Sequence, residues 1–309
     1  MVALKPLVKF DARIVMWAVI VALLPATIVQ TWAYGLGVLL VVVTSVAACV
    51  AIEAVFLLYV GREAKAAVAD GSVWVAGLLI ALAVPPDTGT LVLIVAAAFA
   101  VLVAKHAFGG LGHNVFNPAM VGYAAILVSF PLDLAIWPTS NFVEVSNNDG
   151  LTGATALDLA RQGLFPDARH EAARAGGDTT SSALAVAYLV GGLALVGMRF
   201  ADWRLVAPFL VSVVVSAAIV TLLKPDGYGV WMHLVHGTTI AGAFFIITDP
   251  VTAPAGAKAR AIYAGVIGVL TVLIREYGGY PDGLAFAVLL GNACAPALER
   301  VFLLTERRG

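Results

Sequence analysis

Hydrophobic residues form long runs along almost the whole chain, broken by short polar or proline-rich stretches. A helix that crosses a bilayer needs about 20 mostly apolar residues, and this template predicts ten membrane spans, several of them short or interrupted. A secretory signal followed by a water-soluble chain does not fit, because the apolar runs never stop. The predicted spans centre on Ile14–Trp32, Leu36–Val60, Val73–Val84, Thr90–Ala104, Pro118–Phe130, Ser182–Met198, Trp203–Leu223, Val230–Ile247, Ala261–Ile274 and Leu284–Leu304.

The composition agrees with a membrane environment. Of the 309 residues, 61% are hydrophobic and 12% are charged, against about 25% charged in an average soluble domain. We therefore predict an all-α polytopic membrane protein with a single membrane domain over residues 1–309. A net charge of -1 offers no basic surface to nucleic acid. The two cysteines are too few for an iron–sulfur cluster held by four thiolates of this chain.

Basic residues collect in the short loops on one side of the predicted spans, as is typical of cytoplasmic loops. The opposite loops carry only Lys224 and Arg275, apart from the long segment Pro131–Ser181, and long loops cross a membrane with little regard to charge. Both termini are therefore predicted to be cytoplasmic, and the long loop to lie on the outer face. The basic side holds Lys5, Lys9, Arg13, Arg62, Lys65, Lys105, Arg199, Arg204, Lys258, Arg260, Arg300, Arg307 and Arg308.

Two parts of the chain carry similar interruptions in the same order. The third span ends in Ala83–Gly89 and the eighth at Ile247–Pro254. The fifth span begins at Phe116, and the tenth is predicted to be interrupted from Gly291. One explanation is that proline and glycine are simply frequent in membrane helices. The short third and fifth spans favour the other explanation, a true internal repeat.

The repeat hypothesis divides the chain into pseudo-repeats over about 1–135 and 182–309, joined by an outer-face loop over 136–181. With five spans in each copy, the second copy is inverted relative to the first. Inverted repeats with broken helices at corresponding positions place a binding site near the middle of the membrane.

The strongest chemical signal is Asp149-Gly150-Leu151-Thr152-Gly153-Ala154-Thr155 in the long loop. As local structure alone, it is a turn followed by small residues and a threonine that could cap a short helix over Ala156–Gln162. The full heptapeptide resembles the Asp-Gly-x-Ser/Thr-Gly-Ala-Thr motif at which a flavin transferase esterifies the phosphate of FMN to the last threonine. The resemblance implies a covalent FMN on Thr155, within a recognition motif that includes Asp149, Thr152, Gly153 and Ala154.

The resemblance extends to other parts of the chain. Gly109–Ala119, Val128–Pro131 and Thr248–Pro254 are similar in sequence, order and spacing to the NqrB/RnfD family of membrane flavoproteins, and the short stretch before the first span is typical of the RnfD branch. This implies an electron-transfer subunit of an ion-translocating ferredoxin:NAD oxidoreductase complex in the bacterial inner membrane. The implied partners are the other membrane and peripheral subunits, including a second flavin-carrying subunit, and a flavin transferase during maturation.

Several alternatives stay open at this point. The chain could instead be an NqrB-like subunit of a sodium-pumping NADH:quinone oxidoreductase, a transporter or channel without flavin, or a scaffold subunit. A second, non-covalent flavin such as riboflavin is also left open, as is the coupling ion. The sequence offers no nucleophile with its base and no complete metal site, so catalysis would belong to the assembly.

Polar residues beside the predicted helix breaks are the candidates for a second binding site. Asn117 and Pro118 lie at the mouth of the fifth span, and Asp249 and Thr252 follow the eighth. Free backbone N–H groups at such broken ends could hold a flavin carbonyl or phosphate. A kinked helix end satisfied by its own side chains explains the pattern equally well.

Ionisable residues inside the predicted spans are the last candidates. Glu53 lies deep in the second span, where a charge is costly, and it is a candidate for cation or proton passage. The alternative is a packing residue that is protonated or hydrogen-bonded to a neighbour. His233 and His236 are three apart and are predicted to share a helix face. Without a carboxylate or thiolate beside them, polar contacts are a better prediction than a metal site.

Overall fold

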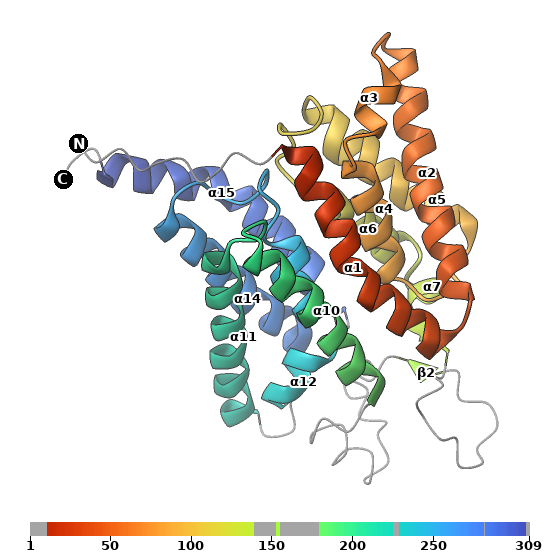
Figure 1. Ribbon diagram of the computed structural model, residues 1–309. Coiled ribbons are helices and arrows are strands. Elements are labelled where there is room, and N and C mark those ends of the chain that lie inside the picture. Colours follow the sequence, from red (N-terminus) through yellow and green to blue (C-terminus); the bar gives the residue numbers. More distant parts are fainter. Residues whose placement is uncertain (1–10, 139–152, 155–178, 225–228, 281, 307–309) are drawn as a thin grey trace, which may run out of the picture.

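The computed structural model describes residues 11–138, 153–154, 179–224, 229–280 and 282–306 (Figure 1). Nearly all of this part of the chain is helical, which confirms the predicted fold class. The first half contains α1 (Ala12–Tyr34), α2 (Gly37–Tyr59), α3 (Ala64–Val68), α4 (Ser72–Leu82), α5 (Thr90–Ala98), η1 (Phe99–Lys105), η2 (His106–Phe108), α6 (Pro118–Ser129) and α7 (Pro131–Ala135). The second contains α10 (Thr179–Gly197), α11 (Trp203–Leu223), α12 (Val230–Val235), α13 (Thr239–Ala241), η3 (Gly242–Ile246), α14 (Ala257–Tyr277) and α15 (Leu284–Glu306).

The two halves of the chain form two groups of helices that lie side by side (Figure 1). They meet where α1 packs against α10 and where α6 packs against α15. The start of α1, α3 and the end of α15 lie at the top of the view, which we call the terminal end. At the opposite end, which we call the loop end, lie α7, α12 and the two short strands of the described chain. These are β1 (Ile136–Trp137) and β2 (Gly153–Ala154), which pair antiparallel.

Seven helical segments of the described chain are long and apolar enough to cross a membrane, which defines a multi-pass membrane protein. They are α1, α2, the continuous segment Thr90–Phe108, α10, α11, α14 and α15. Two further apolar helices, α4 and α6, are shorter. Leu40 and Val43 on α2 and Val211 on α11 are more than half exposed, as expected of side chains that face lipid. The ten-span count and the inverted repeat stay predictions.

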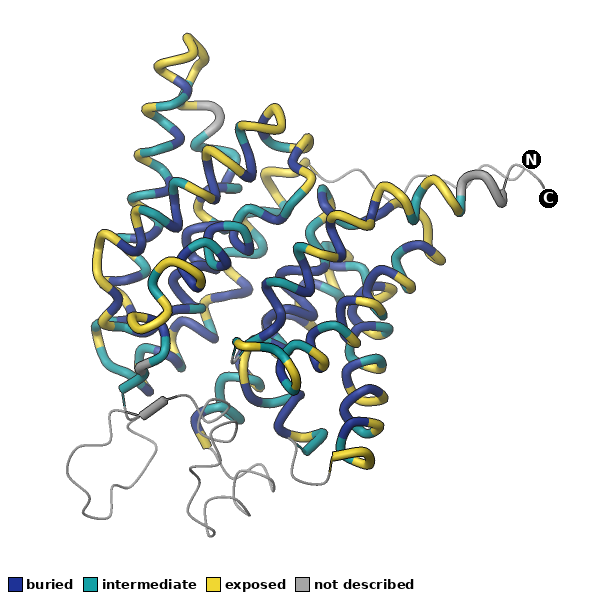
Figure 2. The backbone as a smooth tube through the Cα atoms, turned by 180° about the vertical axis from the view of Figure 1, so that it is seen from behind, coloured by how far each residue is buried: buried dark blue, intermediate teal, exposed yellow. Residues whose placement is uncertain are grey.

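The buried positions concentrate where helices face one another, while exposed positions follow the outward faces and the tip between α2 and α3 (Figure 2). Local sequence explains where several helices begin. Asp11 caps α1 by accepting a hydrogen bond from the backbone N–H of Arg13, and Asp202 does the same for α11. Asn117 caps α6, with Pro118 at the first helical position, where its missing N–H costs nothing.

Three of the predicted helix breaks are present. The half-length helix α4 ends at Leu82, directly before Ala83–Gly89, and α6 begins at Pro118 after a non-helical approach. In the second half, residues 247–256 separate η3 from α14. These breaks leave short helices whose ends lie inside the protein.

The predicted interruption of the tenth span is wrong. α15 runs from Leu284 to Glu306 without a break, with Pro296 inside it. Gly291 serves close packing instead, because a Cβ atom there would lie 2.6 Å from Ile267 Cγ1 on α14. Gly291 is therefore a contact residue between α14 and α15.

Candidate functional site

An aromatic cavity lies at the loop end, lined by residues of both halves. Its volume is about 410 Å³, which falls in the range of pockets that hold small organic ligands, roughly 300–1,000 Å³. We call it the loop-end cavity. The aromatic residues that line it are Tyr34, Tyr123, Trp137, Tyr188 and Tyr280.

The β1–β2 pair holds part of the heptapeptide beside this cavity. Gly153 pairs with Trp137 and Ala154 with Ile136. Trp137 lines the cavity, and its ring lies 5.5 Å from the ring of Tyr34. The other candidate residues of the heptapeptide, Asp149, Thr152 and Thr155, lie outside the described residues.

The second half of the chain contributes a polar corner to the loop-end cavity. Asp282 accepts hydrogen bonds from the backbone N–H of Thr238 at 2.9 Å and from its hydroxyl at 2.5 Å, and its other oxygen lies 3.0 Å from Nη2 of Arg275. Burial would raise the pKa of Asp282, but the charge of Arg275 and these hydrogen bonds outweigh it and hold the pKa below its ordinary value. Asp282 is thus a charged residue that ties the end of α14 to the turn before α13.

His236 also lines the loop-end cavity, and its position corrects the prediction that it shares a helix face with His233. α12 ends at Val235, and His236 is extended, with φ −88° and ψ 151°. Gly237 then has a positive φ of 72°, which favours glycine. Because Asp282 holds Thr238, the helix cannot continue past this turn, and the two histidines point to different surroundings.

The residues beside the two breaks meet where the halves touch. Nδ2 of Asn117 lies 3.5 Å from Oδ2 of Asp249, and Thr252 donates to the same oxygen at 3.2 Å. The backbone N–H of Asn117 donates to Oδ1 of Asn292 on α15 at 3.0 Å, and Asn292 donates to the hydroxyl of Tyr263 at 2.7 Å. We call this group the broken-helix site.

The broken-helix site is largely satisfied by its own side chains. Asn117 caps α6, and Asp249 also accepts from the backbone N–H of Val251 at 3.0 Å. The adjoining pocket, lined by Asn117, Pro118 and Asp249 among others, has a volume of about 70 Å³. Since a water molecule occupies about 30 Å³, this space holds a few waters, and a flavin ring would enter only if the lining side chains moved.

Glu53 is fully buried, and the structure gives it two basic neighbours. Nζ of Lys105 lies 2.7 Å from Oε1 of Glu53 and donates to the hydroxyl of Ser72 at 2.8 Å. Nε2 of His106 lies 3.4 Å from Oε2 of Glu53, and the His106 ring packs 4.4 Å from that of Phe56. The charge of Glu53 therefore has a partner within the protein, and its part in cation or proton passage stays a prediction.

Two basic residues were assigned to loops from the sequence, and both assignments are wrong. Lys105 belongs to η1 and is 4% exposed, and Arg275 lies in the last turn of α14 with no exposed surface. Both are buried because an acid lies within reach, Glu53 for Lys105 and Asp282 for Arg275. The sequence signal that could have identified these two buried basic residues is the acid of each pair, because a buried carboxylate in a membrane protein needs a partner.

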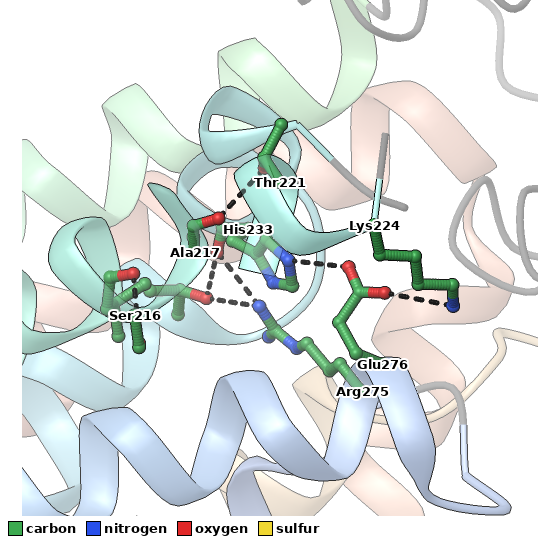
Figure 3. Close-up of polar contacts among 9 residues, drawn as sticks. Ser216, Ala217, Thr221, Lys224, His233, Arg275 and Glu276 are labelled. Atoms are coloured by element: carbon green, nitrogen blue, oxygen red, sulfur yellow. Dashed lines mark hydrogen bonds and ion pairs between the residues drawn. The ribbon is translucent and has the colours of Figure 1, made fainter. Parts of the chain in front are cut away.

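Metal binding finds no support in the described part of the chain. No group of three or more His, Cys, Asp or Glu residues is placed to hold a metal ion there. His233 instead contacts the carboxylate of Glu276, with 3.1 Å between Nε2 and Oε1 (Figure 3). His233 thus makes the predicted polar contact, but the premise that no carboxylate lies beside it is wrong, because Glu276 comes from the distant α14.

The fold and these sites define a multi-pass α-helical membrane protein with broken helices that meet between two halves and an aromatic cavity at one end. The chain belongs to the NQR2, RnfD, RnfE family, which it matches over residues 4–306. The resemblance predicted from the motifs is thus confirmed.

Curated relatives agree with this assignment. The D subunit of the ion-translocating oxidoreductase complex of Aeromonas hydrophila is 37% identical, over 94% of this chain and 92% of the relative. The D subunit of the same complex in Vibrio cholerae serotype O1 is 36% identical, over 94% of this chain and 93% of the relative.

Proposed function

We propose that this chain is a membrane subunit of an ion-translocating oxidoreductase complex of the ferredoxin:NAD type. In this proposal it passes electrons through an FMN joined to Thr155 by a phosphodiester bond, and other subunits of the complex supply and accept the electrons. The relatives at 36–37% identity are named as the D subunit of an ion-translocating oxidoreductase complex, which supports the assembly. The observation that carries the flavin is the complete heptapeptide Asp149–Thr155.

The loop-end cavity fits a tethered flavin. Its volume and aromatic walls suit a planar ring system, and Trp137 pairs with Gly153 of the heptapeptide. Tyr34, Tyr188 and Trp137 would pack on the ring, and Gln30 and His236, which also line the cavity, would offer hydrogen bonds to its polar edge. A bound flavin would supply the capacity to take up and release electrons one or two at a time.

The chain itself contributes attachment and position. Ala154, the residue directly before Thr155, is fixed by its pairing with Ile136. A short tether holds a group at an effective concentration in the millimolar range beside its binding site. Covalent attachment would therefore keep the cofactor at the cavity even if its non-covalent affinity were low.

The experiment that tests the flavin proposal is a denaturing gel of the chain co-expressed with its flavin transferase and viewed under ultraviolet light. We expect a fluorescent band for the wild type and none for Thr155→Val. The control Thr152→Val keeps the attachment residue and should retain a band, though a dimmer one if the transferase recognises Thr152. A dark wild-type band, with an unmodified Thr155 peptide in the mass spectrum, would reject the flavin and favour a transporter without a cofactor.

Ion translocation is the second part of the proposal, with Glu53 as the candidate on the ion path. Glu53→Gln keeps the shape of the side chain and an oxygen that accepts a hydrogen bond from Lys105. Because this variant leaves Lys105 buried without its acid, we expect it to be less stable. In proteoliposomes of the variant that still holds its flavin, we expect less ion transport per electron transferred. Unchanged coupled transport would mean that Glu53 only pairs with Lys105. A second, non-covalent flavin at the broken-helix site, held by Asn117, Pro118, Asp249 and Thr252, stays a proposal for spectroscopic flavin counting.

A further inference from the structure

A second buried carboxylate lies at the loop end, outside the sites considered so far. The side chain of Glu276 is 1% exposed and contacts two bases with its two oxygens (Figure 3). Oε1 lies 3.1 Å from Nε2 of His233, whose side chain has no exposed surface, and Oε2 lies 3.4 Å from Nζ of Lys224, which is 46% exposed. We call these three residues the Glu276 cluster.

Three helix ends bring the Glu276 cluster together. Glu276 lies in the last turn of α14, Lys224 directly follows α11, and His233 belongs to the short α12. α11 packs along α14 and also against α12. The carboxylate thus has one oxygen directed to the interior and one to a lysine at the surface.

The neighbouring Arg275 is engaged elsewhere. Nη1 of Arg275 donates to the backbone oxygen of His233 at 2.9 Å and to the hydroxyl of Thr239 at 2.8 Å, and Nη2 contacts Asp282. Arg275 and Asp282 therefore balance each other. Glu276 instead contacts His233 and Lys224. Because Lys224 is about half exposed, solvent screens the attraction between its charge and that of Glu276.

A contact of 3.1 Å between an imidazole and a carboxylate requires one proton between the two atoms. With one proton, a neutral histidine donates to a carboxylate. A further proton gives either a histidinium beside the carboxylate or a carboxylic acid beside the histidine. The pair can therefore gain or lose one proton while both residues remain in place. Burial lowers the pKa of His233 below its ordinary value, and the hydrogen bond to Glu276 offsets this only in part.

The described groups around this pair leave a route by which a proton could pass between the pair and the solvent. Lys224 and the ring of Tyr277, which lies 5.7 Å from its Nζ, are on the surface side. Arg275 and Asp282 form their own pair on the interior side, and His236 follows on the wall of the loop-end cavity. Because Lys224 is 46% exposed, the surface side of the Glu276 cluster is within reach of solvent.

From this arrangement we infer that the Glu276–His233 pair is a proton-binding site that exchanges one proton with the solution at the loop end, past Lys224. The reaction is a simple equilibrium in which the pair plus one proton gives the protonated pair. Because His233 also anchors Arg275 through its backbone oxygen, the site lies beside the polar corner of the loop-end cavity. Negative charge that enters this cavity, such as an electron, would then be compensated by proton uptake at the pair.

The test is a pH titration of the purified full chain in lipid nanodiscs, followed by infrared difference spectroscopy. These spectra report both products, a carboxylic acid carbonyl band or histidinium ring bands. The chain has five histidines, so several titrations can fall between about pH 5 and 8. We expect one of them to be lost or displaced in Glu276→Gln. The exposed Glu63 gives the matched control, and Glu63→Gln should leave this titration unchanged.

Lys224 variants keep the test decisive if Glu276→Gln disturbs the fold, because Lys224 is at the surface. Lys224→Gln removes a positive charge that favours the carboxylate, so the midpoint should rise by about 0.5 pH unit, roughly a threefold change in proton affinity. Lys224→Arg keeps the charge and should restore the wild-type midpoint. If no band between pH 5 and 8 depends on Glu276 or Lys224, the cluster is a fixed ion pair and the inference is wrong.

The coupling to the cavity rests on the proposed flavin and has its own readout. Reduction of a flavin takes up protons of its own, so its midpoint potential falls with pH in any case. If the two sites are linked, the slope of this potential against pH should change additionally at the titration of the pair, and Glu276→Gln should remove that change. The same slope in the wild type and in Glu276→Gln would reject the coupling. A dark band in the gel experiment would reject the flavin instead, while the infrared titration would still decide the proton site.

Discussion

At the scale of single residues, the charges buried in this molecule are balanced by partners from other elements. Glu53 on α2 has Lys105 of η1, which is 52 positions away in the sequence, and Arg275 has Asp282 across the turn between α14 and α15. Removing one member of a buried pair leaves an uncompensated charge, which typically costs about 3–5 kcal/mol. Each pair therefore behaves as a unit.

Lys105→Met tests this balance. The variant leaves Glu53 buried without its cation, so we expect a stability loss of about 3–5 kcal/mol, seen as a lower unfolding midpoint in detergent. The double variant Glu53→Gln with Lys105→Met should recover most of the loss, because no charge is left unpaired. Lys65→Met, at an exposed position of α3, serves as the control and should change little. Equal losses in the single and double variants would argue against a coupled pair.

The sequence predicted single residues unevenly, and the reason is distance along the chain. The helix start at Asn117 and Pro118 follows from adjacent residues, and in the structure Asn117 caps α6 there. Lys105 and Arg275 were assigned to loops because a basic residue at the end of an apolar run looks the same whether its partner is water or a distant acid. Asn292 was missed because its partners, Asn117 and Tyr263, lie on other elements.

At the scale of elements, the broken helices are the part of the fold that the sequence predicted best. Proline-rich breaks are local, so Ala83–Gly89 and Thr248–Pro254 were both identified. The two halves also share an arrangement that no local pattern reveals. Lys105, near the end of the helical segment that follows the first break, donates to Ser72 at the start of α4 at 2.8 Å. Arg275, near the end of α14, donates to Thr239 at the start of α13, also at 2.8 Å. The internal repeat itself stays a prediction.

Close packing between the halves depends on α10. A Cβ atom on Gly191 would lie 1.9 Å from the backbone oxygen of Ala22 on α1, and one on Gly192 would lie 2.2 Å from the ring of Phe244 in η3. These two glycines let α10 approach both neighbours. Small residues at helix contacts are the usual means of close approach in membrane proteins.

Gly191→Ala should therefore push α1 and α10 apart and lower stability by at least about 1–3 kcal/mol, the usual cost of overpacking. The same helix offers a matched control. Nothing lies within 4 Å of a Cβ atom on Gly197, so Gly197→Ala should raise stability by about 0.4–1 kcal/mol through the entropy of the unfolded chain. The measurement is the thermal midpoint of each variant in one detergent. Similar midpoints for the two variants would mean that the contact with Ala22 is loose.

At the scale of the whole molecule, the two ends differ in exposed charge, and this difference bears on orientation. Arg62, Lys65, Arg199, Arg204 and Lys258 are exposed at the terminal end. At the loop end, Lys224 is exposed, while Arg275 is buried beside Asp282. Buried and neutralised basic residues should not count in the comparison of loops, which removes Arg275 from the loop end and Lys105 from the terminal end. The excess of exposed basic residues at the terminal end remains.

The positive-inside rule then predicts that the terminal end faces the cytoplasm and the loop end, with the β1–β2 pair and the loop-end cavity, faces the outer side. Alkaline phosphatase inserted between Asn141 and Asp178 should be active, because its disulfides form only in an oxidising compartment. The same reporter placed between α10 and α11, in residues 198–202, should be inactive, while a fluorescent protein there should mature. The opposite pattern would place the cavity and the Glu276 cluster on the cytoplasmic side. A flavin transferase acting outside the cytoplasm could not then reach Thr155, so the outcome also bears on the attachment proposal.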